Sequence, residues 1–228
     1  MFRAFITAVS FVASAPVWAC DIALVLAVDV SGSVDTSEFR IQMDGLADAL
    51  RDPLVTEALL AGGAAITVLQ WTGTTRQVVS VPWVEVTSRG DLETLAGQIE
   101  GAPREWRNYS TAIGEALDFA RMQFETAPVC RRRVIDISGD GTSNEGIAPG
   151  DMRARLEDQD ITVNALVIEG EEPDLTAYFR ANVISGGGAF AVTASSFDEY
   201  PQRMREKLLR EVTSPVSFSP LSVTQEPL

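Results

Sequence analysis

Apolar runs of strand length alternate with segments of helical periodicity along most of this chain. Residues 21–28 read DIALVLAV, a continuous apolar run typical of a strand covered on both faces. The next segment, residues 35–51, has its apolar residues at helical spacing. Further strands are predicted at residues 64–71, 76–86, 133–138, 161–168 and 189–193, and further helices at 91–100, 111–125, 151–159, 174–184 and 196–212. This alternation predicts an α/β fold with helices on both faces of a mostly parallel sheet, and Pro82 places its strand at an edge.

The composition excludes several classes of function. The chain has 228 residues, which suits one large domain, and it contains no histidine and two cysteines. Catalysis by Ser-His-Asp or Cys-His groups and His-ligated zinc are therefore excluded, and two cysteines are too few for a Cys-only zinc site or an iron–sulfur cluster. A formal net charge of −14 argues against nucleic-acid binding. Any metal must be held by oxygen atoms.

Residues 1–19 are predicted to be a secretory signal peptide. Arg3 supplies the positive start, residues 5–12 form a short apolar stretch, and Val17-Trp18-Ala19 precedes the predicted cleavage site. The apolar stretch is too short to span a membrane, so no transmembrane segment is expected in the mature chain. The alternative is a buried first helix, which Pro16 disfavours. The protein is therefore expected to be periplasmic or secreted. At the other end, residues 213–228 are rich in Ser and Pro and are predicted to be a disordered tail.

The two cysteines each precede a predicted strand. Cys20 lies directly before residues 21–28, and Cys130 lies shortly before residues 133–138. If these strands are parallel neighbours, both sulfurs lie at the same edge of the sheet, and an oxidising compartment would allow a Cys20–Cys130 disulfide. Two unpaired thiols are the alternative. Cleavage after Ala19 would also make Cys20 the first residue, which raises a lipid anchor as a second alternative, although the bulky Trp18 fits a lipidation signal poorly.

Three short segments rich in side-chain oxygen follow strands or open a helix. They are Asp29-Val30-Ser31-Gly32-Ser33, Ser110-Thr111 and Gly139-Asp140-Gly141. Ligands of open α/β sheets bind beyond the carboxyl ends of the strands, where the first and third segments are predicted to lie. Mg²⁺ takes about six oxygen ligands, and two carboxylates with three hydroxyls would suit it. Each segment alone is more typical of a turn or a helix cap, but their combination predicts a metal site. Its five side chains are Asp29, Ser31, Ser33, Thr111 and Asp140.

In these residues the chain resembles a von Willebrand factor type A domain with a metal-ion-dependent adhesion site. Asp29 to Ser33 match the Asp-x-Ser-x-Ser signature, Thr111 stands at the metal threonine, and Asp140 stands at the second aspartate. The family often has Thr where this chain has Gly139. The resemblance covers residues 20–212, and it is greatest to small exported bacterial members without assigned function.

The resemblance implies a Rossmann-like, doubly wound, six-stranded sheet with one antiparallel edge strand. It also implies a bound Mg²⁺, with Mn²⁺ or Ca²⁺ as alternatives, and a partner protein that presents Asp or Glu to the metal. Ser31, Ser33 and Thr111 would be direct or near-direct ligands, and Asp29 and Asp140 would often act through water.

The loop before Thr111 reads REWRNY over residues 104–109 and is expected to surround the metal. Trp and Arg are frequent in the energetic centres of interfaces, so we expect Trp106, Arg107 and Tyr109 to contact the partner. The alternative for Trp106 is that it fills a local hydrophobic gap.

The leading functional hypothesis is an exported, non-enzymatic, metal-dependent protein-binding module. One alternative is a metal-dependent phosphohydrolase with Asp29 as nucleophile. Such enzymes need a second acid two residues later, where this chain has Ser31, and a lysine, of which the chain has only Lys207 in its last predicted helix. Another alternative is a scaffold that the metal stabilises. The sequence does not indicate an oligomeric state.

Overall fold

A computed structural model describes residues 20–170 and 174–213 of the chain. Its six strands form one sheet in the order β3-β2-β1-β4-β5-β6. Strand β3 pairs antiparallel with β2, and all the other neighbouring strands are parallel. The predicted fold class is therefore confirmed, with Pro82 in the antiparallel edge strand. The strands are β1 (Cys20–Asp29), β2 (Ala64–Trp71), β3 (Gln77–Val86), β4 (Cys130–Gly139), β5 (Ile161–Ile168) and β6 (Ala191–Ala194).

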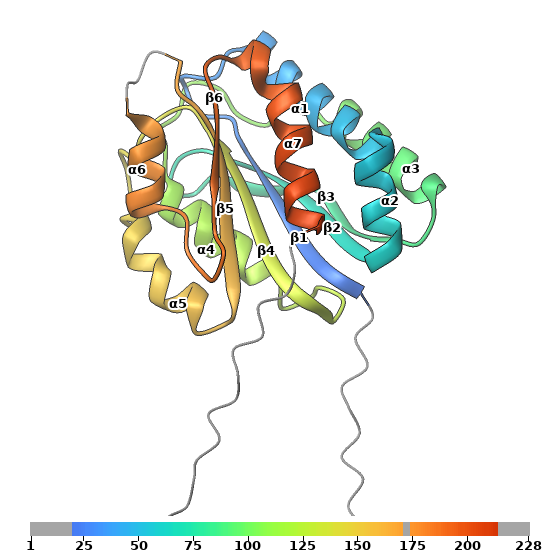
Figure 1. The fold of residues 1–228 in the computed structure, drawn as a ribbon. Helices are drawn as coiled ribbons and strands as arrows, with labels where there is room; N and C mark the ends of the chain where they lie inside the picture. The colour runs from blue at the N-terminus through green and yellow to red at the C-terminus, as the bar shows by residue number, and fades with distance from the viewer. Residues whose placement is uncertain (1–19, 171–173, 214–228) are drawn as a thin grey trace, which may run out of the picture.

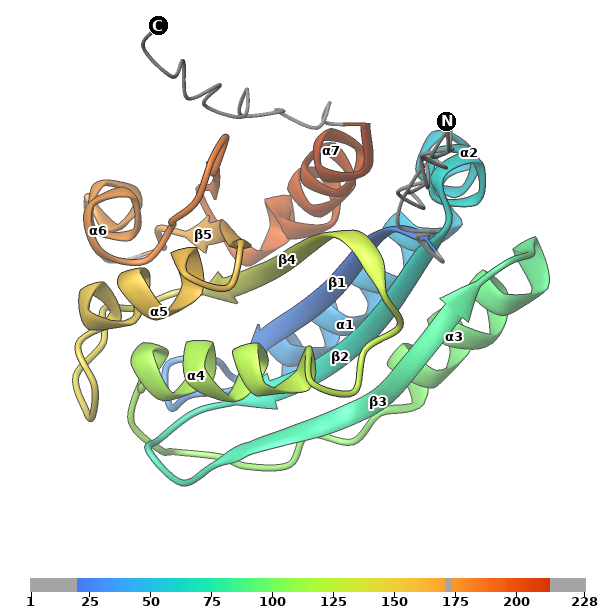
Figure 2. The same ribbon diagram turned by 90° about the horizontal axis from the view of Figure 1, so that it is seen from below.

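Helices cover both faces of the sheet (Figures 1 and 2). One face packs against α1 (Thr36–Arg51), α2 (Pro53–Gly62), α3 (Arg89–Gly101) and α7 (Tyr200–Thr213). The other packs against α4 (Ile113–Gln123), α5 (Arg153–Glu157) and α6 (Leu175–Asn182). Each side has its own apolar core because the continuous apolar runs of the central strands project side chains alternately to the two faces.

Two parts of the helical prediction were wrong. No helix was expected at Pro53–Gly62, but the Asp52 carboxylate accepts hydrogen bonds from the amides of Leu54 and Val55 and starts α2 there, with Pro53 in its first turn. The segment is apolar nearly all round, which hides its periodicity. The helix expected at residues 151–159 is instead a 3₁₀ turn (Pro149–Met152) followed by the short α5.

The ends of the chain lie largely outside the described residues. The predicted signal peptide, residues 1–19, and residues 214–228 of the predicted tail are not described. Helix α7 continues through Thr213, the first residue assigned to the tail by the sequence. Within residues 20–170 and 174–213, no helix is both long enough and apolar enough to cross a membrane.

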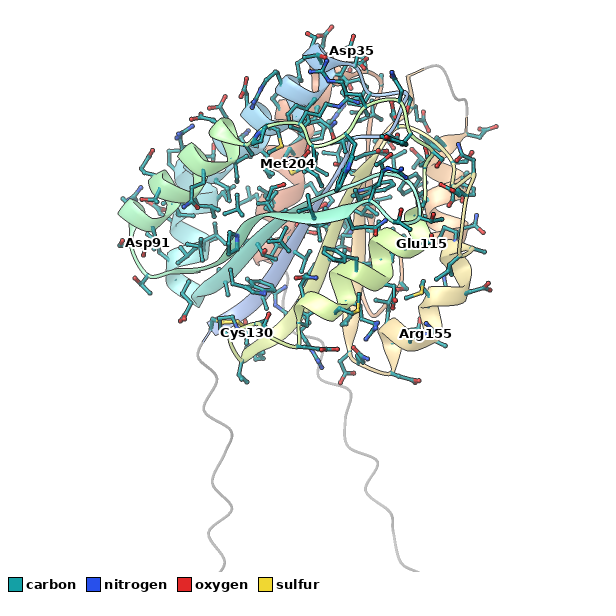
Figure 3. All side chains as sticks on the ribbon, turned by 180° about the vertical axis from the view of Figure 1, so that it is seen from behind. Asp35, Asp91, Glu115, Cys130, Arg155 and Met204 are labelled. Carbon is teal, nitrogen blue, oxygen red and sulfur yellow. A yellow bond between two sulfur atoms is a disulfide. The ribbon has the colours of Figure 1, made fainter. Side chains whose placement is uncertain are left out.

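The Cys20–Cys130 disulfide is confirmed. The two residues lie opposite each other in the register of β1 and β4, and their Cα atoms are 4.6 Å apart. The bond links the amino-terminal ends of the two central strands, β1 and β4. In Figure 3 the label of Cys130 lies at the opposite end of the molecule from Asp35, which caps α1 beside the loop after β1. The disulfide and the predicted metal site are therefore at opposite edges of the sheet.

Candidate metal centre

Three loops meet at the carboxyl edge of the sheet. The amide of Gly32, after β1, donates a 2.8 Å hydrogen bond to the carbonyl of Tyr109, which precedes α4. The Ser33 hydroxyl donates a 2.6 Å hydrogen bond to Oδ1 of Asp140, which follows β4. A Cβ atom on Gly32 would lie 3.1 Å from the Tyr109 carbonyl oxygen, so glycine permits this close approach. The structure thus brings the three oxygen-rich segments of the sequence together.

Asp29 ends β1 and is completely buried. Its Oδ1 accepts a 2.7 Å hydrogen bond from the amide of Ser31, whereas its Oδ2 has no hydrogen-bond partner among the described residues. The Ser31 and Ser33 hydroxyl oxygens are 3.2 Å apart. A buried carboxylate oxygen without a donor is unfavourable unless a cation or another group compensates it. The two serines and the two aspartates form a set of oxygen donors that fits a hard divalent cation.

The electrostatics of the centre favour binding of a cation. Burial and, after it, the negative charge of Asp140 raise the pKa of Asp29 to about 8, although the hydrogen bond from the Ser31 amide opposes the shift. Among the described residues that line the pocket over this centre, none is a lysine or an arginine. A bound divalent cation would favour ionised Asp29 and Asp140 side by side.

Thr111 lies in the loop before α4 and not in the first turn of the helix, where the sequence placed it. Two hydrogen bonds with Asn144 fix its backbone. The Thr111 amide donates to Oδ1 of Asn144 at 3.0 Å, and the backbone amide of Asn144 donates to the Thr111 carbonyl at 2.9 Å. Ser143 caps the helix by accepting the amide of Ile113. These contacts hold the third segment against the loop after β4.

A pocket of about 810 Å³ opens over the centre. It contains Ser33, Thr111 and Asp140, together with residues from α1 and from the segment that leads into α7. The lining residues are Gly32, Ser33, Glu38, Ile41, Tyr109, Thr111, Asp140, Gly141, Thr142, Asn144, Gly170, Ser196, Phe197 and Asp198. The candidate centre is therefore accessible to a ligand larger than water.

The three residues expected to contact a partner have different surroundings. Tyr109 is 41% exposed, lines the pocket, and stacks under the guanidinium of Arg76 at 3.7 Å. Arg107 is exposed, and Trp106 is half-buried and packs against the core on the α1 side of the sheet. Among the described residues that line the pocket, neither Trp106 nor Arg107 occurs.

Several supporting residues were not identified from the sequence. Arg104 donates through Nη2 to the carbonyls of Val30, Ser31 and Val34, and so ties the loop after β1 to the loop before α4. Gln42 of α1 donates to the Asp29 carbonyl and accepts from the Ser138 hydroxyl. Arg104 could have been noticed because it belongs to the REWRNY segment. For Gln42 the sequence offered no indication of a role except that it lies among the apolar positions of a predicted helix.

The sequence profile of a family described as "Protein of unknown function (DUF1194)" matches residues 19–216. This chain belongs to that family. None of the curated proteins matches this DUF1194 chain.

Solved structures show which fold the DUF1194 chain has. Proximal thread matrix protein 1 from the mussel byssus has a TM-score of 0.64 at 19% identity over 85% of this chain and 46% of its own. A von Willebrand factor type A protein from Catenulispora acidiphila has 0.60 at 17%, over 85% and 43%. The pilus adhesin SpaC from Lactobacillus rhamnosus GG has 0.61 at 11%, over 85% and 31%.

The chain spans less than half the length of each of these proteins, and the low identities establish the fold alone. That fold is the von Willebrand factor type A fold, as the sequence predicted. A further structure of the mussel protein has zinc in its metal-ion-dependent adhesion site motif.

Proposed function

We propose that this DUF1194 chain is a metal-dependent protein-binding module. Asp29, Ser31, Ser33, Thr111 and Asp140 would hold a divalent cation, and a partner protein would present Asp or Glu to it. The observation that carries the proposal is the completely buried Asp29 carboxylate. Its Oδ2 has no donor within residues 20–170 and 174–213, while the Ser31, Ser33 and Asp140 oxygens lie on the neighbouring loops.

The chain's own residues prepare this site for an external ligand. A divalent cation bound here would offer a coordination position to a carboxylate from outside. Ser31, Ser33 and Thr111 would contribute neutral oxygen atoms, so the cation would keep more of its charge than among carboxylates alone. Arg104 and Asn144 fix the loops and reduce the entropy lost when a ligand binds.

The occupied motif of the mussel protein supports a divalent cation in the same fold. We propose Mg²⁺, with Mn²⁺ or Ca²⁺ as alternatives, because all five donors are oxygen atoms. We also propose that Trp106, Arg107 and Tyr109 contact the partner. Tyr109 has the best support, because it is exposed and lines the pocket.

A periplasmic or secreted location is part of the proposal. The disulfide is typical of proteins from oxidising compartments. It also uses the Cys20 sulfur, which a lipid anchor on that residue would need for itself. The disulfide therefore favours an unlipidated Cys20.

The binding role is favoured over phosphohydrolysis. The chain's only lysine, Lys207, is completely buried against Asp136 and Glu211 and does not line the pocket. No phosphate-binding lysine is therefore available beside Asp29.

Isothermal titration of the purified chain with Mg²⁺ and Mn²⁺ tests the metal site. We expect the wild type and the control Asp48→Ala, an exposed residue of α1, to bind equally well. Asp29→Ala and Ser31→Ala should lose binding by at least about tenfold. Wild-type protein that binds neither ion at millimolar concentration would refute the proposal. Turnover of a phosphoester that Asp29→Ala abolishes would favour the enzyme instead.

A further inference from the structure

The pocket above the candidate metal centre is acidic on its α1 and α7 side. Its ionisable lining residues apart from Tyr109 are Glu38, Asp140 and Asp198, and the described lining contains no lysine or arginine. The exposed Asp198 carboxylate has no hydrogen-bond or ion-pair partner among the described residues. Burial raises the pKa of Glu38, and the charges of Asp35 and Asp140 add to the shift, while the Asp35 amide and the charge of Arg104 oppose it. This wall of the pocket therefore attracts positive charge.

Apolar surface lines the same pocket as these acids. Ile41 of α1 and Phe197, which precedes α7, both line the pocket and pack partly against the core. Long cationic side chains place their methylene groups on such apolar surface while their charged ends reach polar partners. The combination of Ile41, Phe197, Glu38 and Asp198 fits a lysine or arginine side chain.

The charge balance at the centre points in the same direction. Asp29 and Asp140 together offset the two positive charges of a divalent cation. The carboxylate of a partner then adds a further negative charge close to Glu38 and Asp198. Like charges brought together at short distance weaken binding, and a neighbouring cation on the same partner removes that penalty.

The size of the pocket leaves room for more than one carboxylate. Its volume of about 810 Å³ lies within the range of about 300–1,000 Å³ that is usual for ligand pockets. Independently of the acidic wall, the buried Oδ2 of Asp29 has no hydrogen-bond donor among the described residues, and a cation held at the candidate metal centre would compensate it.

We propose that the partner segment carries an acidic residue and, a few residues away, a lysine or arginine. The acidic side chain would bind the metal, and the basic side chain would lie on Ile41 and Phe197 with its charge between Glu38 and Asp198. This inference rests on the proposed function and adds the chemical class of the partner: a segment with paired acidic and basic residues, not a purely acidic one.

Selection from a random peptide display library tests the inference. The folded chain is immobilised, the library is bound in the presence of Mg²⁺, and bound peptides are eluted with a chelator. We expect eluted peptides to be enriched in Asp or Glu together with Lys or Arg at a preferred spacing. The same selection on Glu38→Gln with Asp198→Asn should keep the acidic enrichment and lose the basic one. Gln at position 38 retains an acceptor for the Asp35 amide, so the helix cap is preserved.

A selected peptide and its analogue with Gln in place of the basic residue are then compared by titration at saturating Mg²⁺. We expect the wild type and the control Asp48→Asn to prefer the basic peptide by about tenfold or more, and the double variant to prefer it by less than about twofold. Chelator-eluted peptides that carry acids without bases would overturn the inference and leave the proposed function intact. Failure to elute any peptide with chelator would overturn both.

Discussion

Asp29 combines complete burial, a second carboxylate nearby and one oxygen atom that no described residue reaches with a donor. Burial in the first place, and then the charge of Asp140, raise its pKa from the usual 3.8 to about 8. We therefore expect the metal-free protein to hold a proton on Asp29 at neutral pH. Metal binding requires the ionised carboxylate, so it must release this proton.

We therefore predict that Mg²⁺ affinity rises with pH up to about pH 8, by close to tenfold per unit. Titration calorimetry at pH 7 in buffers of different ionisation enthalpy should detect release of about one proton per ion. The variant Asp29→Asn should show neither the proton release nor the strong binding. An affinity that stays constant between about pH 6 and 8 would contradict this assignment of the proton.

Substitutions of Arg107 and Trp106, in the loop before Thr111, distinguish a role in partner binding from a role in core packing. Because Arg107 is exposed, Arg107→Ala should weaken partner capture without changing stability or metal affinity. Trp106→Ala should also lower the free energy of unfolding, by about 1–3 kcal/mol, because the indole packs against the core. Pull-down and chemical denaturation measure the two effects. If both variants capture the partner as well as the wild type, this loop is not part of the interface.

Proximity of the five candidate ligands could be predicted from the sequence because four of them follow two strands that become neighbours in a parallel sheet. The second wall of the pocket could not. In the sequence, Glu38 looks like part of a helix cap, and Asp198 looks like an ordinary acid in the first turn of the last predicted helix. Only the packing of α1 beside the start of α7 brings the two to one pocket.

At the scale of elements, α7 is held to the sheet by a buried ion cluster. The Lys207 ammonium lies 2.5 Å from an Asp136 carboxylate oxygen of β4 and 2.8 Å from Oε1 of Glu211. Asn164 of β5 donates to the same Glu211 oxygen at 3.0 Å. Burial, with the neighbouring charge of Glu211, raises the pKa of Asp136 to about 8. One lysine thus pairs with two buried acids.

Lys207→Ala should destabilise the protein by about 3–5 kcal/mol, because it leaves two acids buried without their cation. Gln202→Ala, on the exposed side of the same helix, should change stability by less than about 0.5 kcal/mol. Chemical denaturation followed by circular dichroism measures both. A loss below about 1 kcal/mol for Lys207→Ala would show that the cluster contributes little.

Strands β1, β2 and β5 were predictable as elements because their apolar runs are long. Helix α2 was not, since Pro53–Gly62 has no polar face and follows α1 after the single residue Asp52. The segment at residues 149–157 has only one buried side chain in its α-helical part, Leu156, so its helical period is weak.

At the scale of the whole molecule, the disulfide closes a loop between residues 110 positions apart at the edge of the sheet far from the candidate metal centre. The double variant Cys20→Ser/Cys130→Ser should therefore lower the free energy of unfolding by about 2–4 kcal/mol. Its Mg²⁺ affinity should stay within about twofold of wild type. Denaturation with and without reductant, and titration of the variant, measure the two quantities. A large loss of metal affinity would show that the two edges are coupled.

More of the topology than of the site could be predicted from the sequence, because strand–helix alternation restricts a chain to few arrangements. Pro82 correctly marked the edge strand, while its antiparallel direction came from the family resemblance. What binds at the pocket depends on side chains from distant segments, and alternation carries no information about them.

The start of β1 and the end of α7 lie at the same pole of the molecule. Arg132 joins them, because it bonds to the Asp21 carboxylate and donates to the carbonyl of Glu211 at 2.9 Å. A sensor chip, bead or fusion partner coupled through either of these ends would therefore leave the opposite pole turned toward the solution. Capture experiments can use either attachment without hiding the pocket, and agreement between the two orientations would exclude artefacts of the support.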